Sequence, residues 1–293
     1  MRYVLENDTL RVEIDSFGAE LKSVKRKSDD KEYMWYADKK YWGRTSPVLF
    51  PFVGNCRNKE YRYGGKTYAI GQHGFARDME HTMESRTEDT IWFSLHSNEE
   101  TKEKYPFAFV LKIGYNLTGN ELKVMWKVEN PDTKTLYFSI GAHPAFLCPF
   151  NGEENKLGYG LQFAGLKEVH HHGNTPDTGL AVMSEDIVIP LEDEKVYFTP
   201  GFFDRCTYMV EGKQTGEVSL VTPDGKPYVT MDFDAPLFAI WSPEGKDAPF
   251  VCIEPWYGRC DADDFEGTLE ERAYENAVEP EQTFEASYSI RYL

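Results

Sequence analysis

Hydrophobic and polar residues alternate in many short segments along the chain, with the period of two residues that is typical of half-buried β-strands. The alternating segments are residues 10–15, 20–27, 90–97, 109–117, 121–130, 136–143, 218–223, 228–233, 237–243, 250–256 and 284–293. Glycine, proline, asparagine or aspartate separates most neighbouring segments, and these residues favour chain reversal. The pattern therefore predicts more than ten strands.

Two pairs of segments are predicted to form hairpins, because TGN joins FVLKIGYNL to ELKVMWKVEN and DGK joins VSLVTP to PYVTMDF. A helical pattern covers only about ten residues around LEERAYENA, residues 269–277, and Pro280 would end that helix. The glycine-rich polar tract 151–176 has no helical pattern and is expected to be a surface excursion.

So many strands with so little helix predict an all-β fold in which large antiparallel sheets pack face to face. With 293 residues, 41% of them hydrophobic and 15% aromatic, the chain can bury a large core. No break in composition marks a linker, so we expect a single domain over residues 1–293.

The net charge of −17, from 49 acidic and 32 basic residues, argues against nucleic-acid and membrane partners, because such a surface repels phosphates and anionic lipids. No segment approaches the roughly 18 apolar residues of a membrane span, and the first residues do not resemble a signal peptide. We therefore expect a cytoplasmic protein. The five cysteines form no CxxC pair, which favours reduced, buried thiols over disulfides or a metal site.

Three short runs, residues 51–78, 139–146 and 250–261, concentrate residues that a β core normally avoids. In the first run, Arg57 and His73 flank a predicted hairpin with a Gly-Gly turn, which can bring the two residues close together. A glycine follows His73, so the backbone there can approach a ligand closely. A histidine that only caps a loop through a hydrogen bond fits this position equally well.

The other two runs each carry one ionisable residue at a strand-like position. His143 is either a core histidine with a partner or an acid at the end of a strand. Glu254 follows the apolar PFVCI, so its carboxylate is either paired with a cation or raised in pKa by burial, and a raised pKa suits a general base. Trp256 fits a platform for a sugar ring and a core tryptophan equally. The HHH run at 170–172 favours a solvated segment over a metal site, because consecutive residues of an extended chain face opposite sides.

Together these runs resemble the aldose 1-epimerase (mutarotase) family, and more closely its LacX-type branch than the galactose mutarotases. GNCRN, YRYGGKTYAI and HGF resemble the family's arginine, its GKTY-type hairpin and its first histidine. GAHPAF resembles the H-P-Y-F segment, and CIEPWYGRCD is similar to the segment with the catalytic glutamate. The resemblance extends over essentially the whole chain.

The resemblance implies a β-supersandwich (galactose mutarotase-like) and an isomerase that interconverts the α and β anomers of a hexose with no cofactor and no metal. Glu254 would take the proton of the C1 hydroxyl while His143 protonates the ring oxygen, the two groups lying on opposite sides of the anomeric centre. The ring would then reclose with the roles exchanged. His73, Arg57 and Trp256 would bind the sugar.

Two further substrate-binding residues are implied. Arg77 occurs in this branch and in hexose-6-phosphate mutarotases, and it either binds substrate or pairs with Asp78. Asp204 either matches an acidic substrate-binding position or caps a turn. The family's tyrosine in H-P-Y-F is Ala145 here and its asparagine before the histidine is Ala142, so the identity of the sugar cannot be carried over.

Three functions stay open: a mutarotase for a free hexose, a mutarotase for a hexose 6-phosphate, and a non-catalytic carbohydrate-binding or regulatory protein. A phosphosugar would need a basic rim, which Arg57, Arg77 and Arg259 could provide. The presence of both His143 and Glu254 argues against a mere binder, and a single prominent carboxylate disfavours a glycosidase. The expected partner is a small-molecule aldose, and the chain is expected to be a monomer or a homodimer.

Overall fold

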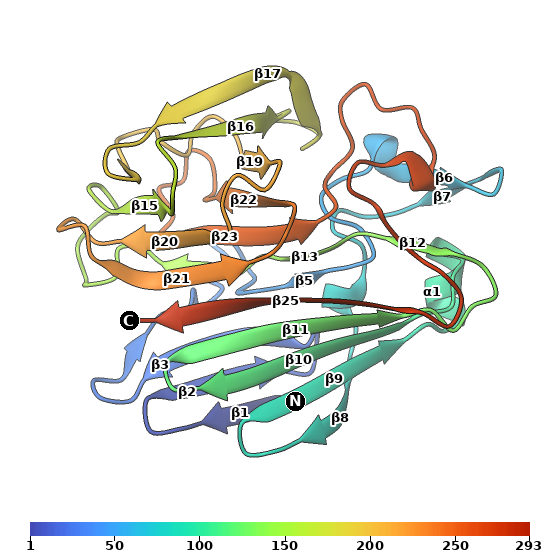
Figure 1. Cartoon of the computed structure of the whole chain (residues 1–293), viewed down its shortest axis with the longest axis horizontal. Coiled ribbons are helices and arrows are strands. Elements are labelled where there is room, and N and C mark those ends of the chain that lie inside the picture. Colours follow the sequence, from blue (N-terminus) through green and yellow to red (C-terminus); the bar gives the residue numbers. More distant parts are fainter.

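The computed structural model describes residues 1–293, and its largest sheet has nine strands (Figure 1). These are β8 (Thr82–Arg86), β9 (Thr90–His96), β10 (Val110–Thr118), β11 (Glu121–Glu129), β15 (Gly160–Phe163), β18 (Lys195–Tyr197), β20 (Glu217–Val221), β21 (Pro227–Phe233) and β25 (Thr283–Tyr292). Their order across the sheet is β18-β15-β20-β21-β25-β11-β10-β9-β8, and all the pairings are antiparallel.

A second sheet has eight strands and carries the residues of greatest chemical interest. They are β5 (Val48–Leu49), β13 (Ile140–Ala142), β14 (Ala145–Leu147), β16 (Glu168–Asn174), β17 (Ala181–Pro190), β19 (Tyr208–Glu211), β22 (Leu237–Trp241) and β23 (Phe250–Tyr257). Their order is β17-β16-β19-β22-β23-β13-β5. Strand β14 pairs with the first three residues of β23, 250–252.

The remaining elements are short. A four-stranded sheet contains β1 (Arg2–Glu6), β2 (Leu10–Asp15), β3 (Glu20–Arg26) and β4 (Lys31–Glu32), and two-stranded sheets join β6 (Glu60–Tyr63) to β7 (Lys66–Ala69) and β12 (Leu136–Phe138) to β24 (Asn276–Val278). The helices are α1 (Glu99–Lys104) and three 3-10 turns, Arg57–Lys59, Ala76–Asp78 and Leu269–Glu271. None of the helices has the length and apolar character needed to cross a membrane.

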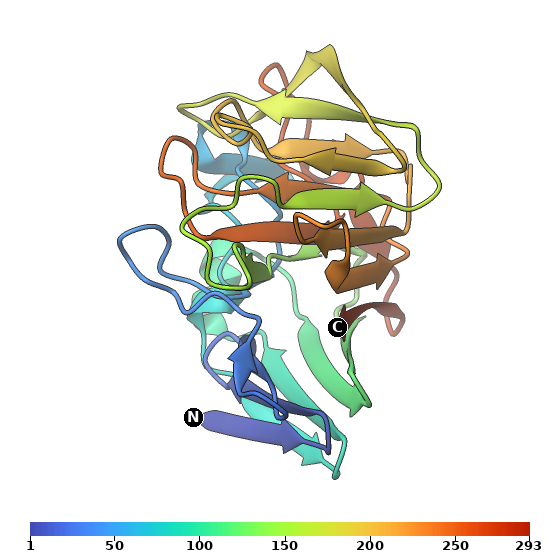
Figure 2. The ribbon, with the colours of Figure 1, turned by 90° about the vertical axis from the view of Figure 1, so that its left-hand side faces the viewer.

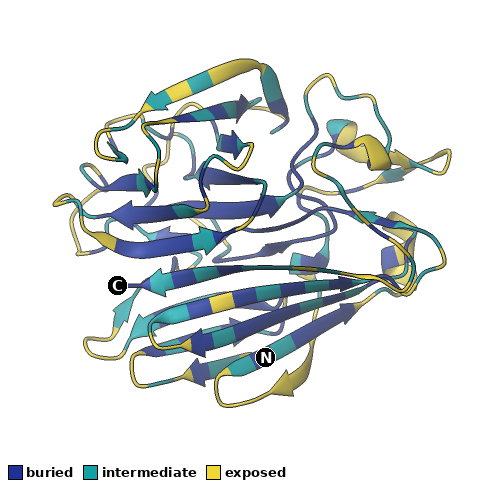
Figure 3. Cartoon of the chain, viewed as in Figure 1, coloured by how far each residue is buried: buried dark blue, intermediate teal, exposed yellow.

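One hydrophobic cluster of 60 buried residues draws on all three larger sheets. Val12 of β2, Ile113 of β10 and Ile253 of β23 belong to it, so the sheets pack face to face. Figure 2 shows the four-stranded sheet lying against β8 to β11, where Tyr3 packs edge to face on Phe93. Figure 3 shows that exposed residues gather in the loops and on the edge strands β8 and β17. The all-β prediction is confirmed.

The predicted hairpins are also confirmed. Strands β10 and β11 pair from Val110–Glu129 to Thr118–Glu121, and β20 pairs with β21. In the β6-β7 hairpin, Gly64 and Gly65 both have positive φ, 55° and 74°, the combination that a tight two-residue hairpin turn requires.

Two predictions about local structure are wrong. Residues 269–277 form a 3-10 turn followed by a residue with positive φ, Tyr274, and then the strand β24, because the side chain of Arg272 turns inward instead of following a helical surface. The tract 151–176 is free of helix, but it is not a surface excursion: β15 lies inside the nine-stranded sheet and β16 inside the eight-stranded one.

The inward-turned Arg272 holds the end of β23 in place. Its guanidinium pairs with Asp261 at 2.7 Å and Glu275 at 2.9 Å, and it donates to the Arg259 carbonyl at 2.8 Å and to Ser139 at 3.1 Å. Because all of these groups are buried, the network is satisfied only while the arginine is present.

We therefore expect Arg272→Met to lower the free energy of unfolding by about 3–5 kcal/mol, since it leaves two buried carboxylates without a cation. Urea denaturation would measure the loss. The control is Arg62→Met, because Arg62 is exposed and donates only to the Gly267 carbonyl at 3.3 Å; it should change the free energy by less than about 0.5 kcal/mol. Equal losses in the two variants would contradict this account.

Candidate active site

A cavity of about 400 Å³ opens beside β23 and contains most of the ionisable residues singled out in the sequence. Strand β23 supplies Glu254 and Trp256, the turn between β13 and β14 supplies His143, and the loop after β7 supplies His73 and Arg77. These residues lie far apart along the chain, so the sheet brings them together.

The alternation of β23 decides which of its side chains reach the cavity. Val251 and Ile253 belong to the main core, whereas Glu254 and Trp256 line the cavity and Cys252 lies beside Glu254 on the same face. Trp256 is only 4% exposed and packs with buried residues of a second cluster, so it is a core tryptophan that also forms part of the cavity wall.

His143 lies beside Glu254 because two short strands on either side of it pair with β23. Gly141 of β13 lies opposite Trp256, and Ala145 of β14 lies opposite Cys252. Gly141 must be a glycine, since a Cβ there would approach Cδ1 of Trp256 to 2.6 Å. The result is a distance of 3.3 Å between Nε2 of His143 and Oε2 of Glu254.

Burial sets the protonation of this pair. Glu254 is 1% exposed and has no arginine or lysine partner, and burial raises its pKa well above the usual value. Burial and the nearby charge of Arg77 lower the pKa of His143 to about 3. Burial thus favours the protonated form of Glu254 and the neutral form of His143. Of the two interpretations of Glu254, the raised pKa is the one that the structure supports.

Two tryptophans that the sequence analysis did not single out enclose His143. Trp42 stacks on the imidazole with ring centroids 4.7 Å apart, and Trp241 meets it edge to face at 5.3 Å. Their apolar surface keeps the pair in a low dielectric, which strengthens electrostatic interactions there. The only sequence signal for Trp42 is a tryptophan within a polar, glycine-containing loop, and such a signal is weak.

His73 both holds a loop and lines the cavity, so the two interpretations of it apply together. It has a positive φ of 64°, its backbone N–H donates to the Gly54 carbonyl at 2.8 Å, and its Nδ1 accepts from the Gly54 N–H at 3.0 Å. Because Nδ1 accepts, the neutral ring carries its proton on Nε2 and offers it as a donor. Burial lowers the pKa of His73 well below the usual value, which keeps the ring neutral.

Arg77 is the one lysine or arginine that lines the cavity. Its Nη2 donates to the Gln72 carbonyl at 2.7 Å, while its Nε lies 3.7 Å from Asp78 and has no hydrogen-bond partner. Asp78 is shared with Arg44 at 2.8 Å. Arg77 therefore makes an ion pair and still has a free donor.

The structure does not bring Arg57 and Asp204 into this cavity. Arg57 donates to the Phe265 carbonyl and pairs with Glu266, both at 3.2 Å, because the turn before β6 directs it toward that segment and away from His73. Asp204 accepts from the Gly245 N–H at 3.0 Å, as a turn-capping residue does. Arg259, considered for a basic rim, is buried against Glu211 at 2.8 Å.

Polar side chains from loops and from the end of β16 complete the cavity, and the sequence offered no pattern that would have identified them. They are Asn55, Gln72, Asn174, Asp177, Thr178 and Glu244. The HHH run lies elsewhere, on β16. His171 faces inward, whereas His170 pairs with Asp186 at 2.8 Å and His172 bonds to the Glu185 carbonyl, so the three rings do not converge.

The residues with metal-binding potential are the catalytic candidates and one thiol. The donor atoms of His143, Cys252 and Glu254 lie within 4.8 Å of one another. An ion would have to displace the proton of Glu254, and burial raises the pKa of Cys252 well above its usual value, which opposes loss of the thiol proton.

Comparison with known proteins points to one family. The model of the aldose 1-epimerase family matches residues 1–262. The chromosomal LacX protein of Lactococcus lactis subsp. lactis is 31% identical over 300 residues that cover the whole of both chains. A galactose mutarotase related enzyme from Lactobacillus acidophilus, whose structure covers 100% of this chain and 97% of its own, is 37% identical with a TM-score of 0.94. A galactose mutarotase-like protein from Lactobacillus casei is 29% identical, with full coverage of both chains and a TM-score of 0.91. The protein therefore has a galactose mutarotase-like fold and belongs to the aldose 1-epimerase family.

Proposed function

We propose that the protein is a mutarotase that interconverts the α and β anomers of a neutral aldose. The observation that carries this proposal is the buried His143–Glu254 pair at the wall of a sugar-sized cavity, with Nε2 and Oε2 3.3 Å apart and the two pKa values displaced in opposite directions. A binding protein needs donors and acceptors, but it gains nothing from two proton carriers with pKa values displaced in opposite directions.

The reaction needs one proton to leave the sugar and one to arrive. Glu254 as the carboxylate takes the proton of the C1 hydroxyl, and protonated His143 donates to the ring oxygen as the bond from C1 to that oxygen breaks. The open aldehyde rotates about C1–C2 and recloses with the roles exchanged. Two protons move in each half of the cycle, one at each oxygen. The pair can therefore also start with the roles exchanged: protonated Glu254 donates to the ring oxygen, and neutral His143 accepts the proton of the C1 hydroxyl.

The separation of the pair changes one expectation from the sequence. At 3.3 Å no sugar fits between His143 and Glu254, so they do not lie on opposite sides of the anomeric centre. The two oxygens of a hemiacetal are bonded to the same carbon, and two groups this close can each meet one of them from the same side. His73, through Nε2–H, and the guanidinium of Arg77 would orient the sugar.

The cavity supports a neutral sugar over a phosphosugar. Three tryptophans, Trp42, Trp241 and Trp256, form much of its wall, and aromatic faces suit the apolar faces of pyranose rings. Its one cation, Arg77, stands against two carboxylates at the rim, Asp177 and Glu244. A hexose 6-phosphate remains the second candidate, because Arg77 with neighbouring Arg44 could bind a phosphate at the edge of the cavity.

Substitution of the pair should abolish activity. We expect His143→Asn and Glu254→Gln each to lower the polarimetric rate of α-D-glucose or α-D-galactose mutarotation at least about 100-fold, because each removes one proton carrier. A matched control exists on the surface: His170 and Glu168 are also 3.3 Å apart but exposed, so His170→Asn and Glu168→Gln should leave the rate unchanged. If the folded wild-type protein accelerates the mutarotation of no aldose, the proposed enzyme activity is refuted and a carbohydrate-binding protein is favoured.

The protonation of the pair can be observed directly. In ¹⁵N NMR spectra, His143 should stay neutral from pH 8 down to about pH 5, because its pKa is lowered to about 3. Asp186 and Glu168 raise the pKa of His170 above the usual histidine value of 6.5, so His170 should already take up its proton at a pH above 6.5. It serves as the internal reference. A His143 ring that carries both protons at pH 7 would contradict the assignment of the proton to Glu254.

The two substrate classes can be separated by comparing α-D-glucose with α-D-glucose 6-phosphate at equal ionic strength. We expect a higher kcat/KM for the neutral sugar, because the cavity rim and the net charge of −17 oppose an anion. A clear preference for the phosphosugar would select the second candidate.

A further inference from the structure

A thiol lies beside the proposed proton carriers and takes no part in the chemistry described above. Cys252 is fully buried on β23, on the same face of the strand as Glu254. The donor atoms of Cys252, Glu254 and His143 all lie within 4.8 Å of one another. A thiolate sulfur, a carboxylate oxygen and an imidazole nitrogen are the donors that zinc sites in proteins use. The three residues therefore have the composition of a metal site.

The spacing of the three donors suits a tetrahedral ion. With bonds of about 2.0–2.3 Å, neighbouring donors around such an ion lie roughly 3.3–3.8 Å apart. Nε2 of His143 and Oε2 of Glu254 are already 3.3 Å apart, and the thiol of Cys252 has to move by little more than about 1 Å. Strand β14 pairs with β23, and Ala145 lies opposite Cys252, so all three residues are on or beside paired strands. Such rigid elements hold metal ligands precisely.

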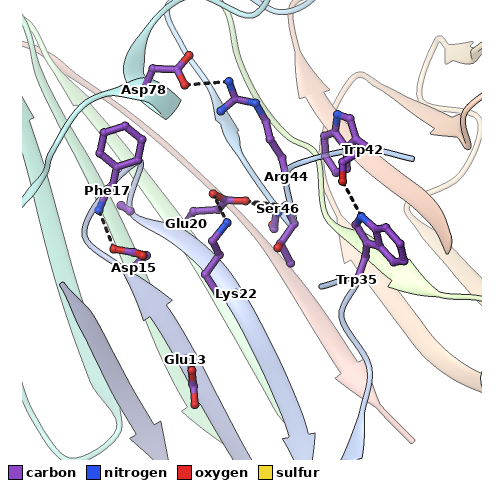
Figure 4. A network of polar contacts seen from close by, with 12 residues as sticks. Glu13, Asp15, Phe17, Glu20, Lys22, Trp35, Trp42, Arg44, Ser46 and Asp78 are labelled. Carbon is purple, nitrogen blue, oxygen red and sulfur yellow. Dashed lines mark hydrogen bonds and ion pairs between the residues drawn. The ribbon is translucent and has the colours of Figure 1, made fainter. Parts of the chain in front are cut away.

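The acceptors at this place are open. Both carboxylate oxygens of Glu254 are buried and have no hydrogen-bond partner, although the residue is only 1% exposed. Figure 4 shows the contrast with Glu20, another buried acid, which accepts from the Ser46 N–H at 2.9 Å and pairs with Lys22 at 2.7 Å. Because buried polar atoms are nearly always satisfied in folded proteins, the two free oxygens of Glu254 point to a ligand.

The charges balance around a divalent ion. A neutral imidazole adds no charge, whereas a thiolate and a carboxylate add two negative charges that match those of the ion. A buried site without net charge avoids the cost of an unpaired charge. Binding releases the protons of Cys252 and Glu254 to the solvent, and coordination makes a thiol give up its proton outright, which overcomes the opposition from burial.

We propose that Cys252, Glu254 and His143 bind a thiophilic divalent ion of the Zn²⁺ type, and that the bound ion inhibits the mutarotase. The ion would hold both proton carriers as ligands, so neither could exchange a proton with the sugar. The inhibition rests on the proposed function, whereas the binding needs only the three ligands. Mg²⁺ and Ca²⁺ prefer oxygen ligands, so neither should bind here.

The test uses Cys252→Ala, which removes the sulfur and leaves both proposed proton carriers in place. Titration calorimetry with Zn²⁺ should show affinity at least about 100-fold weaker than that of the wild type, since loss of an outer-shell partner alone can cost that much. Micromolar Zn²⁺ should slow mutarotation by the wild type at least about tenfold and by the variant less than about twofold. Without metal, the two proteins should have equal rates. Cys252→Ser, which keeps the size of the side chain, should behave in the same way.

A spectroscopic signature and a surface control complete the test. Co²⁺ in place of Zn²⁺ should give the near-ultraviolet charge-transfer band of a thiolate ligand in the wild type, and this band should be absent from Cys252→Ala. The control is His170→Asn, because His170 lies 2.8 Å from Asp186 and 3.3 Å from Glu168 on the surface and could bind an ion on its own. This substitution should leave inhibition by Zn²⁺ unchanged.

Each outcome decides between distinct accounts. Equal Zn²⁺ affinity in Cys252→Ala and the wild type, or inhibition that disappears in His170→Asn, would overturn the metal site and leave the mutarotase standing. Binding that depends on Cys252 but leaves mutarotation unchanged would overturn the inhibition. If the metal-free protein converts no sugar, the proposed function fails, while a thiolate band that depends on Cys252 would still support the site.

Discussion

The burial of one carboxylate with no cation beside it is the constraint on which the candidate site depends. Elsewhere the molecule pairs its buried acids with bases: Asp261 and Glu275 with Arg272, and Glu20 with Lys22. Glu254 has no lysine or arginine partner, and its neighbours are the imidazole of His143, the indole of Trp256 and the thiol of Cys252. An ionised carboxylate in this position would be strongly destabilising, so burial favours the protonated acid. A carboxyl group with a raised pKa has the property that the proposed proton transfer near neutral pH requires.

The sheet keeps that pair in register. Strands β13 and β14 both pair with β23 and leave His143 between them, so the distance from the histidine to Glu254 follows from backbone hydrogen bonds and not from a flexible loop. The network around Arg272 fixes the chain just after β23 and also reaches Ser139, just before β13. Substituting a residue of this distant network would therefore disturb both strands that carry the pair.

The sequence predicts what depends on local pattern and misses what depends on long-range contacts. Alternation and turn residues identified many of the strands and three hairpins, but not β1, β8 or β15 to β19. The position of Glu254 after an apolar run indicated its burial. The helix expected at 269–277 does not form, because Arg272 finds buried partners that helical periodicity cannot reveal. Spacing around a hairpin likewise could not show that Arg57 turns toward Glu266. Trp42 and Trp241 enclose His143 only after folding.

Chemistry and specificity occupy different parts of the molecule. The proposed proton carriers lie on or between strands, whereas the residues that would contact the rest of a sugar lie in loops, among them Trp42, Gln72 and Asp177. Loops tolerate substitution better than paired strands, so the set of accepted sugars can change while the proton transfer is kept. Ala145 illustrates the separation: it stands where the family has a tyrosine, but it is fully buried beside Trp35 and Cys252 and does not line the cavity. The difference therefore alters packing behind the pair, and under the proposed function discrimination between sugars falls to the loops that line the cavity.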